Sequence, residues 1–266
     1  MKRKVNIDTI TFQVLGTITD ILLYYTFLLG SSIGKTGSRG VYRAFQEADE
    51  ELLKCNHQTL ASAWHKLLKN DFVRINNRKG IYNPEITKIG EKFLTQKIPT
   101  YQKNRPWDHK IYLITYDIAE NHHKKRDLLR LFLRKIHCRR FQESVWLTPY
   151  NPRQFINKYI SEKNIEGTII VSDIGRDGGI GETTTESLLS ELYNIERIND
   201  RYKAFLAGTH QKFKSPQKSI FEYLSILKDD PQLPFELLPK SWLGEKAYQA
   251  YEDLKHQYIL LLPGRD

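Results

Sequence analysis

The segment 56–84 reads NHQTLASAWHKLLKNDFVRINNRKGIYNP, and its pattern changes from helical to strand-like along its length. In the first half, apolar residues recur at spacings of three and four on one face of a predicted helix, at Leu60, Trp64, Leu67 and Leu68. In the second half, the short strands predicted at 72–75 and 81–84 flank a basic turn at 76–80. We therefore expect a helix followed directly by a β-hairpin.

The polar face of this helix and the hairpin carry candidate contacts to nucleic acid. A winged helix-turn-helix has this order of elements, with one helix in the DNA major groove and a hairpin on the DNA backbone. The predicted DNA-binding residues are Gln58, Thr59, Ser62, His65 and Lys66 on the helix and Arg74, Asn77, Arg78 and Lys79 on the hairpin. An unrelated helical subdomain with an exposed, solvated hairpin is the alternative interpretation.

Length and composition indicate a folded protein with more than one domain. The chain has 266 residues, of which 40% are hydrophobic and 27% charged, so a disordered or fibrous protein is excluded. Its formal net charge of +10 favours an anionic partner such as nucleic acid or a membrane surface. Cys55 and Cys138 lie far apart and form no CxxC pair, which fits a reduced, cytoplasmic protein.

The N-terminal region contains an apolar stretch at 12–30 that has helical spacing. Asp20 and several hydroxyl-bearing residues interrupt this stretch, and a membrane-spanning helix needs about 20 largely apolar residues. We therefore expect a buried helix that ends near Gly30, and no membrane partner. A second helix is predicted at 41–54.

The middle of the chain alternates between strand and helix patterns. Strands are predicted at 111–118, 141–147 and 168–174, and helices at 124–135 and 152–164. Such alternation suggests a small ferredoxin-like α+β domain of the order βαββαβ.

The last part of the chain has helical patterns only. One long amphipathic stripe begins at 186, and further helices are predicted around 220–227 and 247–262. The fold class is therefore α+β multidomain, with an N-terminal winged helix-turn-helix, a central ferredoxin-like domain and a helical C-terminal domain. The predicted domains cover residues 1–104, 105–182 and 183–266.

Three stretches together carry a resemblance to a known family. Residues 230–247, DPQLPFELLPKSWLGEKA, resemble the C-terminal signature of the phenylacetate-degradation repressor (PaaX) family of transcriptional regulators. The helix that contains Ile195, Tyr202 and Phe205 is similar to the preceding region of that family, and the N-terminal helix and hairpin resemble its DNA-binding domain. This resemblance implies a DNA-binding transcriptional regulator: a dimeric repressor that binds a double-stranded operator and responds to an acyl-CoA-like effector.

The central segment carries a second resemblance. Tyr116-Asp117-Ile118, a downstream Arg126, and residues 141–146, FQESVW, are similar to the small CRISPR-associated endoribonuclease of spacer acquisition. That protein is a ferredoxin-like homodimer, and its aspartate after the first strand is linked to metal-dependent phosphodiester cleavage. Only Asp117 matches this aspartate.

A single carboxylate provides few of the oxygen ligands that Mg²⁺ requires. Asp117 of a second chain, or Asp173 from another predicted strand, could complete such a site, and Arg126 could instead pair with Asp117. We expect a regulator without enzymatic activity or cofactor. A Mg²⁺-dependent nuclease centred on Asp117 is the alternative, and an adaptor that binds nucleic acid without operator specificity is a third hypothesis.

Other residues suggest chemistry less strongly. The pairs at 122–123 (His-His) and 137–138 (His-Cys) lack the i, i+4 spacing of a helical metal site, so solvated loop residues are expected. The glycine-rich stretch 175–181 has no following Lys-Ser/Thr and is interpreted as a flexible connection. The basic clusters 124–126 and 139–140 are interpreted as a solvated face.

Overall fold

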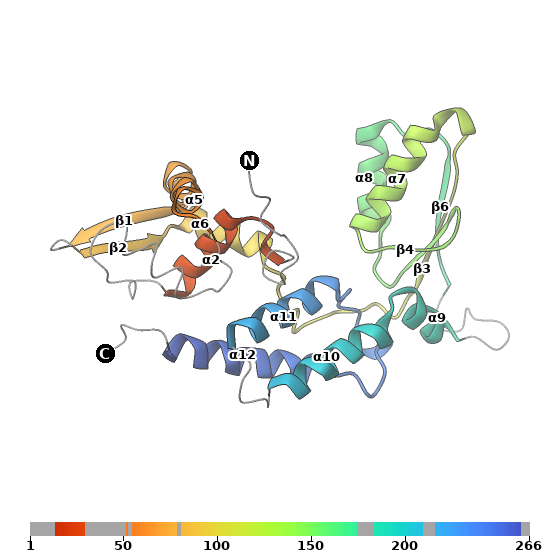
Figure 1. Ribbon diagram of the computed structural model, residues 1–266. Coiled ribbons are helices and arrows are strands. Elements are labelled where there is room, and N and C mark those ends of the chain that lie inside the picture. The colour runs from red at the N-terminus through yellow and green to blue at the C-terminus, as the bar shows by residue number, and fades with distance from the viewer. Residues whose placement is uncertain are drawn as a thin grey trace. The chain divides into compact units, whose positions relative to one another are not determined.

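The structure is a computed structural model that describes residues 14–29, 52, 55–78, 81–174, 184–209 and 216–261 (Figure 1). The chain divides into two compact units. The first unit contains residues 1–101, 201–229 and 243–266, and the second contains residues 102–200 and 230–242. The predicted C-terminal segment 183–266 is thus shared between the units, and the division into three consecutive domains stays a prediction. Of the predicted helix at 41–54, the structure describes only Leu52, which is helical and buried.

The first unit brings the N-terminal helices and one hairpin together. Its N-terminal elements are α2 (Ile18–Leu29), α5 (His57–Lys69), β1 (Val73–Arg78), β2 (Ile81–Ile86) and α6 (Lys88–Lys97). Helix α2 contacts α5, α6 and β2, and α5 also contacts β1, as Figure 1 shows. The apolar residues that predicted α5 face inward, with Leu60, Trp64 and Leu67 buried.

Helix α2 is shorter than the apolar pattern predicted, because Gly16 has a positive φ of 85° just before it. The Thr17 hydroxyl accepts a hydrogen bond from the backbone N–H of Asp20 at 3.1 Å, so it caps the first turn of α2. Asp20 is itself buried and forms an ion pair with Lys97 of α6 at 3.2 Å. Among the described residues, no helix is both long enough and apolar enough to cross a membrane.

The hairpin is longer than the sequence predicted. Its antiparallel register runs from Val73 opposite Ile86 to Arg78 opposite Ile81, so residues 76–78 belong to a strand and not to the turn. A two-stranded ribbon is stabilised by backbone hydrogen bonds that do not depend on apolar side chains. A polar sequence can therefore continue a strand that apolar alternation does not mark.

Three C-terminal helices provide the rest of the first unit's core. They are the second half of α10 (Ile195–Thr209), α11 (Pro216–Asp229) and α12 (Gly244–Leu261). Aromatic rings join these helices to the N-terminal part: Tyr24 of α2 lies 5.1 Å from Phe221, and Tyr101 stacks on Tyr248 at 4.4 Å. The long stripe predicted from residue 186 is in fact two helices, α9 (Thr185–Leu192) and α10, because Asn194 has a left-handed φ of 53°.

The second unit contains a four-stranded antiparallel sheet in the order β4-β5-β3-β6. Its elements are β3 (Tyr112–Asp117), η2 (Glu120–His122), α7 (His123–Lys135), β4 (Arg139–Gln142), β5 (Val145–Thr148), α8 (Arg153–Lys163) and β6 (Thr168–Asp173). Strands and helices follow the predicted order β-α-β-β-α-β. The single strand predicted at 141–147 is two strands, however, because the chain turns at residues 143–144.

The two faces of this sheet have different cores. Helices α7 and α8 cover one face, where Ile114, Leu129 and Trp146 are buried together. On the other face, α9 and the short helix η3 (Phe235–Leu237) contribute to a second cluster around Leu147 and Tyr193.

Buried tyrosines predict how stability depends on alkaline pH. Burial raises the pKa of Tyr24, Tyr193 and Tyr251 above the ordinary value for tyrosine. Because the folded state holds these protons more tightly, their contribution to stability is complete below about pH 10 and is lost as the pH rises through the raised values. In an alkaline titration, we expect these phenols to ionise together with loss of the circular dichroism signal. Ionisation of all tyrosines near the ordinary pKa with the fold intact would contradict this.

Candidate nucleic-acid interface

Helix α5 is fixed at both ends and along its inner face. The side chain of Asn56 accepts the backbone N–H of Thr59 at 2.8 Å, which caps the first turn. At the other end, the backbone N–H of Asn70 donates to the carbonyl of Lys66. Because Leu60, Trp64 and Leu67 are buried, the opposite face of the helix has a defined orientation towards solvent.

The exposed face of α5 contains most of the predicted helix residues. Gln58, Ser62 and His65 are exposed at spacings of four and three, so they form one row along the helix. Lys66 is also exposed beside this row, whereas Thr59 is only partly exposed, at the border of the buried face.

Lys69 continues this row, although it was not among the predicted DNA-binding residues. It is exposed and follows His65 by four residues, so the same helical spacing that identified the row could have identified Lys69. Helix α5 contains no Asp or Glu. A row of amide, hydroxyl, imidazole and ammonium groups without carboxylates is chemically suited to base edges and phosphates.

Arg74, the first of the predicted hairpin contacts, has a local partner that the sequence pattern did not predict. Arg74 is exposed, and its guanidinium binds the carboxylate of Asp71 through two hydrogen bonds of 3.1 Å. This hydrogen-bonded pair lowers the pKa of Asp71 and raises the pKa of Arg74. The positive charge of Arg74 is therefore offset by Asp71.

The other predicted hairpin contacts are only partly described. The backbones of Asn77 and Arg78 belong to β1, opposite Tyr82 and Ile81 in the register, but their side chains are outside the described part. Lys79 lies outside the described residues altogether.

A close contact fixes the hairpin against α6. Thr87 caps α6 by accepting the backbone N–H of Gly90 at 3.1 Å, and its own backbone N–H donates to the carbonyl of Phe72 at 3.0 Å. A Cβ atom at Gly90 would lie only 2.2 Å from that same carbonyl oxygen. Phe72 also stacks on Phe93 of α6 at 4.5 Å. The base of the hairpin therefore has one defined position beside α5 and α6.

The second candidate site, around Asp117, is not assembled as proposed. Asp117 is exposed at the end of β3 and pairs in register with Thr168, whereas Asp173 pairs with Tyr112 at the opposite end of β3. Five residues of antiparallel strand separate the two ends by about 17 Å. The expectation that Asp173 approaches Asp117 within one chain is therefore wrong. Asp173 instead forms ion pairs with Lys110 at 3.4 Å and Arg153 at 3.6 Å.

The suggested partner of Asp117 is not bound to it either. Among the described residues, no ion pair joins Arg126 to Asp117, and the Nε of Arg126 is buried without a hydrogen-bond partner. The described residues also contain no group of three or more His, Cys, Asp or Glu side chains that could hold a metal ion.

The structure describes both His-containing pairs, at 122–123 and 137–138, but not the glycine-rich stretch. Cys138 is fully buried and not a solvated loop residue, and burial raises the pKa of its thiol to about 12. Its neighbour His137 accepts the hydroxyl of Tyr193 through the backbone carbonyl at 2.6 Å. The glycine-rich stretch 175–181 is not among the described residues.

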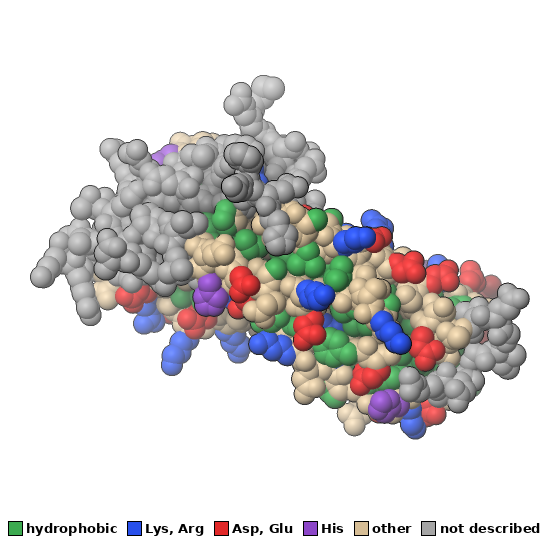
Figure 2. All heavy atoms as spheres, turned by 90° about the horizontal axis from the view of Figure 1, so that it is seen from below, with side chains coloured by type: hydrophobic (Ala, Val, Ile, Leu, Met, Phe, Trp, Pro, Cys, Tyr) green, Lys and Arg blue, Asp and Glu red, His purple; other side chains and the backbone are tan. Residues whose placement is uncertain are grey.

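The basic clusters of the central segment are partly engaged. Lys125 donates from its ammonium to the carbonyls of Lys163 and Asn164 at the end of α8, at 2.6 and 2.8 Å. Arg139 lies over the ring of Tyr193 at 5.2 Å. Among the described side chains visible in Figure 2, basic and acidic groups are interspersed.

Comparisons with known proteins show the family to which the chain belongs. The family description "PaaX protein central Cas2-like domain" matches residues 104–184, and "PaaX-like protein C-terminal domain" matches residues 193–260. The chain belongs to the PaaX family and has a Cas2-like central domain. Members of this family are in general transcriptional regulators rather than enzymes.

A solved structure shares the fold. The chain resembles the uncharacterized protein Rv0674 from Mycobacterium tuberculosis with a TM-score of 0.58 and 14% sequence identity, over 92% of this chain and 96% of that chain. A search of curated proteins finds no match.

Proposed function

We propose that the protein is a DNA-binding transcriptional repressor whose helix α5 reads an operator in the major groove. In this proposal α2, α5, the β1–β2 hairpin and α6 act as a winged helix-turn-helix. The observation that carries it is the exposed, carboxylate-free row on α5, whose opposite face is buried beside the hairpin. Family membership supports DNA as the partner.

The second unit, which contains the four-stranded sheet, has a separate role in this proposal. Its β-α-β-β-α-β order and antiparallel sheet support a ferredoxin-like domain that is structural and forms a homodimer. A dimer would place two winged helices on the two half-sites of a palindromic operator, separated by about one helical turn of DNA or a multiple of it. From the family resemblance, we propose that the repressor acts in the cytoplasm and responds to an acyl-CoA-like effector.

A binding screen on fragments of the source genome tests this function. We expect a small set of fragments to bind far more tightly than bulk DNA, with protection of a palindromic site. Equal affinity for all fragments would favour the adaptor hypothesis, and absence of DNA binding would refute the proposal.

Replacing Arg78 by alanine should weaken binding to every DNA sequence by a similar factor. A lost phosphate contact releases one counterion fewer, so the slope of log affinity against log salt should become shallower by about one unit. Arg74→Ala should change this slope less, because Asp71 already offsets that charge. Arg140→Ala, at an exposed residue of the second unit, is the matched control and should leave the slope unchanged. An unchanged slope in Arg78→Ala would mean that this side chain does not contact DNA.

A nuclease centred on Asp117 is the second candidate function, because the central domain is Cas2-like. We expect the wild type and Asp117→Asn to be equally inactive on RNA, single-stranded DNA and duplex DNA with Mg²⁺ or Mn²⁺. One exposed carboxylate supplies too few of the six oxygen ligands that Mg²⁺ prefers. Cleavage that co-purifies with the wild type and is absent from Asp117→Asn would establish the nuclease.

A further inference from the structure

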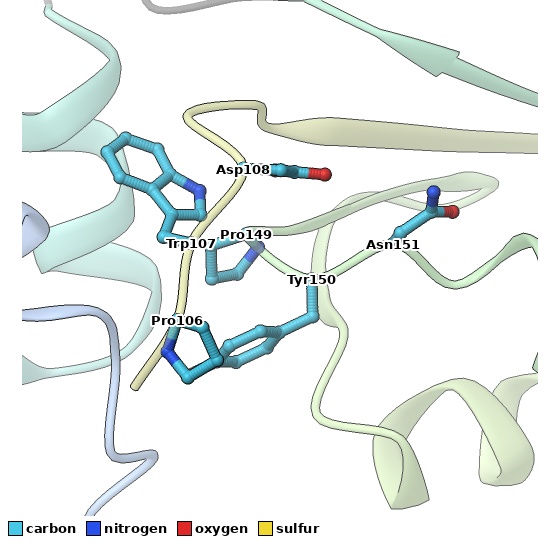
Figure 3. A pocket seen from close by; sticks show the side chains of 6 residues that line it. All are labelled: Pro106, Trp107, Asp108, Pro149, Tyr150 and Asn151. Carbon is cyan, nitrogen blue, oxygen red and sulfur yellow. The ribbon is translucent and has the colours of Figure 1, made fainter. Parts of the chain in front are cut away.

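An open pocket of about 340 Å³ lies within the second unit, where the start of the central segment meets the loop between β5 and α8 (Figure 3). It is lined by Pro106, Trp107, Asp108, Pro149, Tyr150 and Asn151. Its volume is within the range of pockets that bind small molecules, and its wall combines apolar rings with polar groups.

The aromatic side chains of this pocket are held in place by hydrogen bonds to the backbone. The indole N–H of Trp107 donates to the carbonyl of Lys110 at 2.9 Å, and the Tyr150 hydroxyl donates to the carbonyl of Gln232 at 2.7 Å. Both polar atoms are therefore satisfied by the protein itself. The Tyr150 ring and the exposed part of the Trp107 ring, which also packs against the second core cluster and lies 4.9 Å from the ring of His109, provide apolar and π-electron surface to a ligand.

The polar part of the wall includes one carboxylate. Asp108 accepts the backbone N–H of Lys110 at 3.0 Å and the hydroxyl of Tyr112 at 2.5 Å, so neutral donors fix its orientation. No Lys or Arg among the described residues forms an ion pair with Asp108. Its negative charge is thus oriented but not balanced by a direct cationic partner.

The nearby cations are bound elsewhere. Lys110 and Arg153 both pair with Asp173, and Arg153 also lies over the Tyr112 ring at 5.0 Å. Arg105 donates to the carbonyls of Gln102 and Leu233 and lies 4.5 Å from the centre of the Phe235 ring. Lys110 and Arg153 thus share the one carboxylate of Asp173, and the residues that line the pocket include no Lys or Arg.

We propose that this pocket binds a small organic cation, an ammonium or amidinium group carried on an apolar body. The carboxylate of Asp108 would balance the charge, and the faces of Trp107 and Tyr150 would attract the cation and cover the apolar part. The same carboxylate disfavours anions, so this site is separate from any site for the acyl-CoA-like effector. The proposal does not depend on DNA binding.

Three probes that share one ring and differ in charge test the site: benzylamine, benzyl alcohol and benzoate. Binding to the full chain is followed by the NMR signal of the Trp107 indole N–H, assigned with the variant Trp107→Phe. We expect benzylamine to shift this signal at millimolar concentration and to bind about tenfold more tightly than benzyl alcohol, with benzoate weakest.

Variants separate the charge effect from the apolar contact. Asp108→Asn retains an oxygen acceptor for Tyr112 and should reduce benzylamine binding to the level of benzyl alcohol without changing the latter. Asp127→Asn, at an exposed carboxylate on α7, is the matched control and should leave all three affinities unchanged. Benzoate binding as tightly as benzylamine, or an unchanged preference in Asp108→Asn, would overturn the proposal. Operator binding should be the same in these variants, so failure here is distinct from failure of the repressor proposal.

Discussion

Replacing Gln58 and Ser62 by alanine should each weaken binding to the preferred operator by about 1–3 kcal/mol, which is roughly 5- to 150-fold. Both residues lie in the exposed row of α5, where amide and hydroxyl groups can bind base edges. Binding to random DNA should change little, because that binding depends on phosphate contacts and not on base contacts. The measurement is fluorescence anisotropy with an operator duplex and a scrambled duplex at one salt concentration.

Two control variants test whether the loss of affinity comes from lost base contacts. Gln96→Ala removes an exposed amide from α6 and should leave both affinities unchanged. Lys69→Ala removes a charge from the same row as Gln58 and should weaken binding to both duplexes by a similar factor, as expected for a phosphate contact. If Gln58→Ala and Ser62→Ala weaken binding to both duplexes equally, α5 does not read base sequence.

Gly90→Ala should destabilise the protein, although Gly90 lies within a helix. Intrinsic helix propensity alone favours alanine over glycine by about 1 kcal/mol. The Cβ atom, however, would lie 2.2 Å from the backbone oxygen of Phe72 and 2.9 Å from the side chain of Ile86. Relieving such overlap requires a backbone shift that costs about 1–3 kcal/mol or more. We therefore expect a lower urea midpoint and weaker DNA binding, since the hairpin would move relative to α5.

Whether Gly90→Ala lowers or raises the urea midpoint decides between the close contact and helix propensity. Glu91→Ala, at the next and exposed position of α6, tests helix propensity without the contact and should change the urea midpoint little. A raised midpoint in Gly90→Ala would show that propensity outweighs the contact and that α6 does not lie tightly against Phe72.

Local sequence patterns were sufficient for several elements of this protein. The apolar spacing of Leu60, Trp64 and Leu67 predicted both the helix α5 and its exposed face, since a residue's place on a helix follows from its number. The patterns of the central segment similarly predicted both of its helices and the strands around them, although the hairpin of β4 and β5 was read as one strand. The polar strand ends near Arg78 and the left-handed residue Asn194 carried no such periodic signal, so the hairpin length and the break between α9 and α10 were missed.

The sequence by itself determined which faces of the helices and strands are apolar, because periodicity depends only on neighbours along the chain. Contacts between distant segments depended on the tertiary structure. The antiparallel register of β3 and β6 separates Asp117 from Asp173, and the approach of α6 to Phe72 leaves room only for glycine at position 90. Tyr24 meets Phe221 nearly two hundred positions later in the chain. Such pairings depend on how elements pack, which no local pattern encodes.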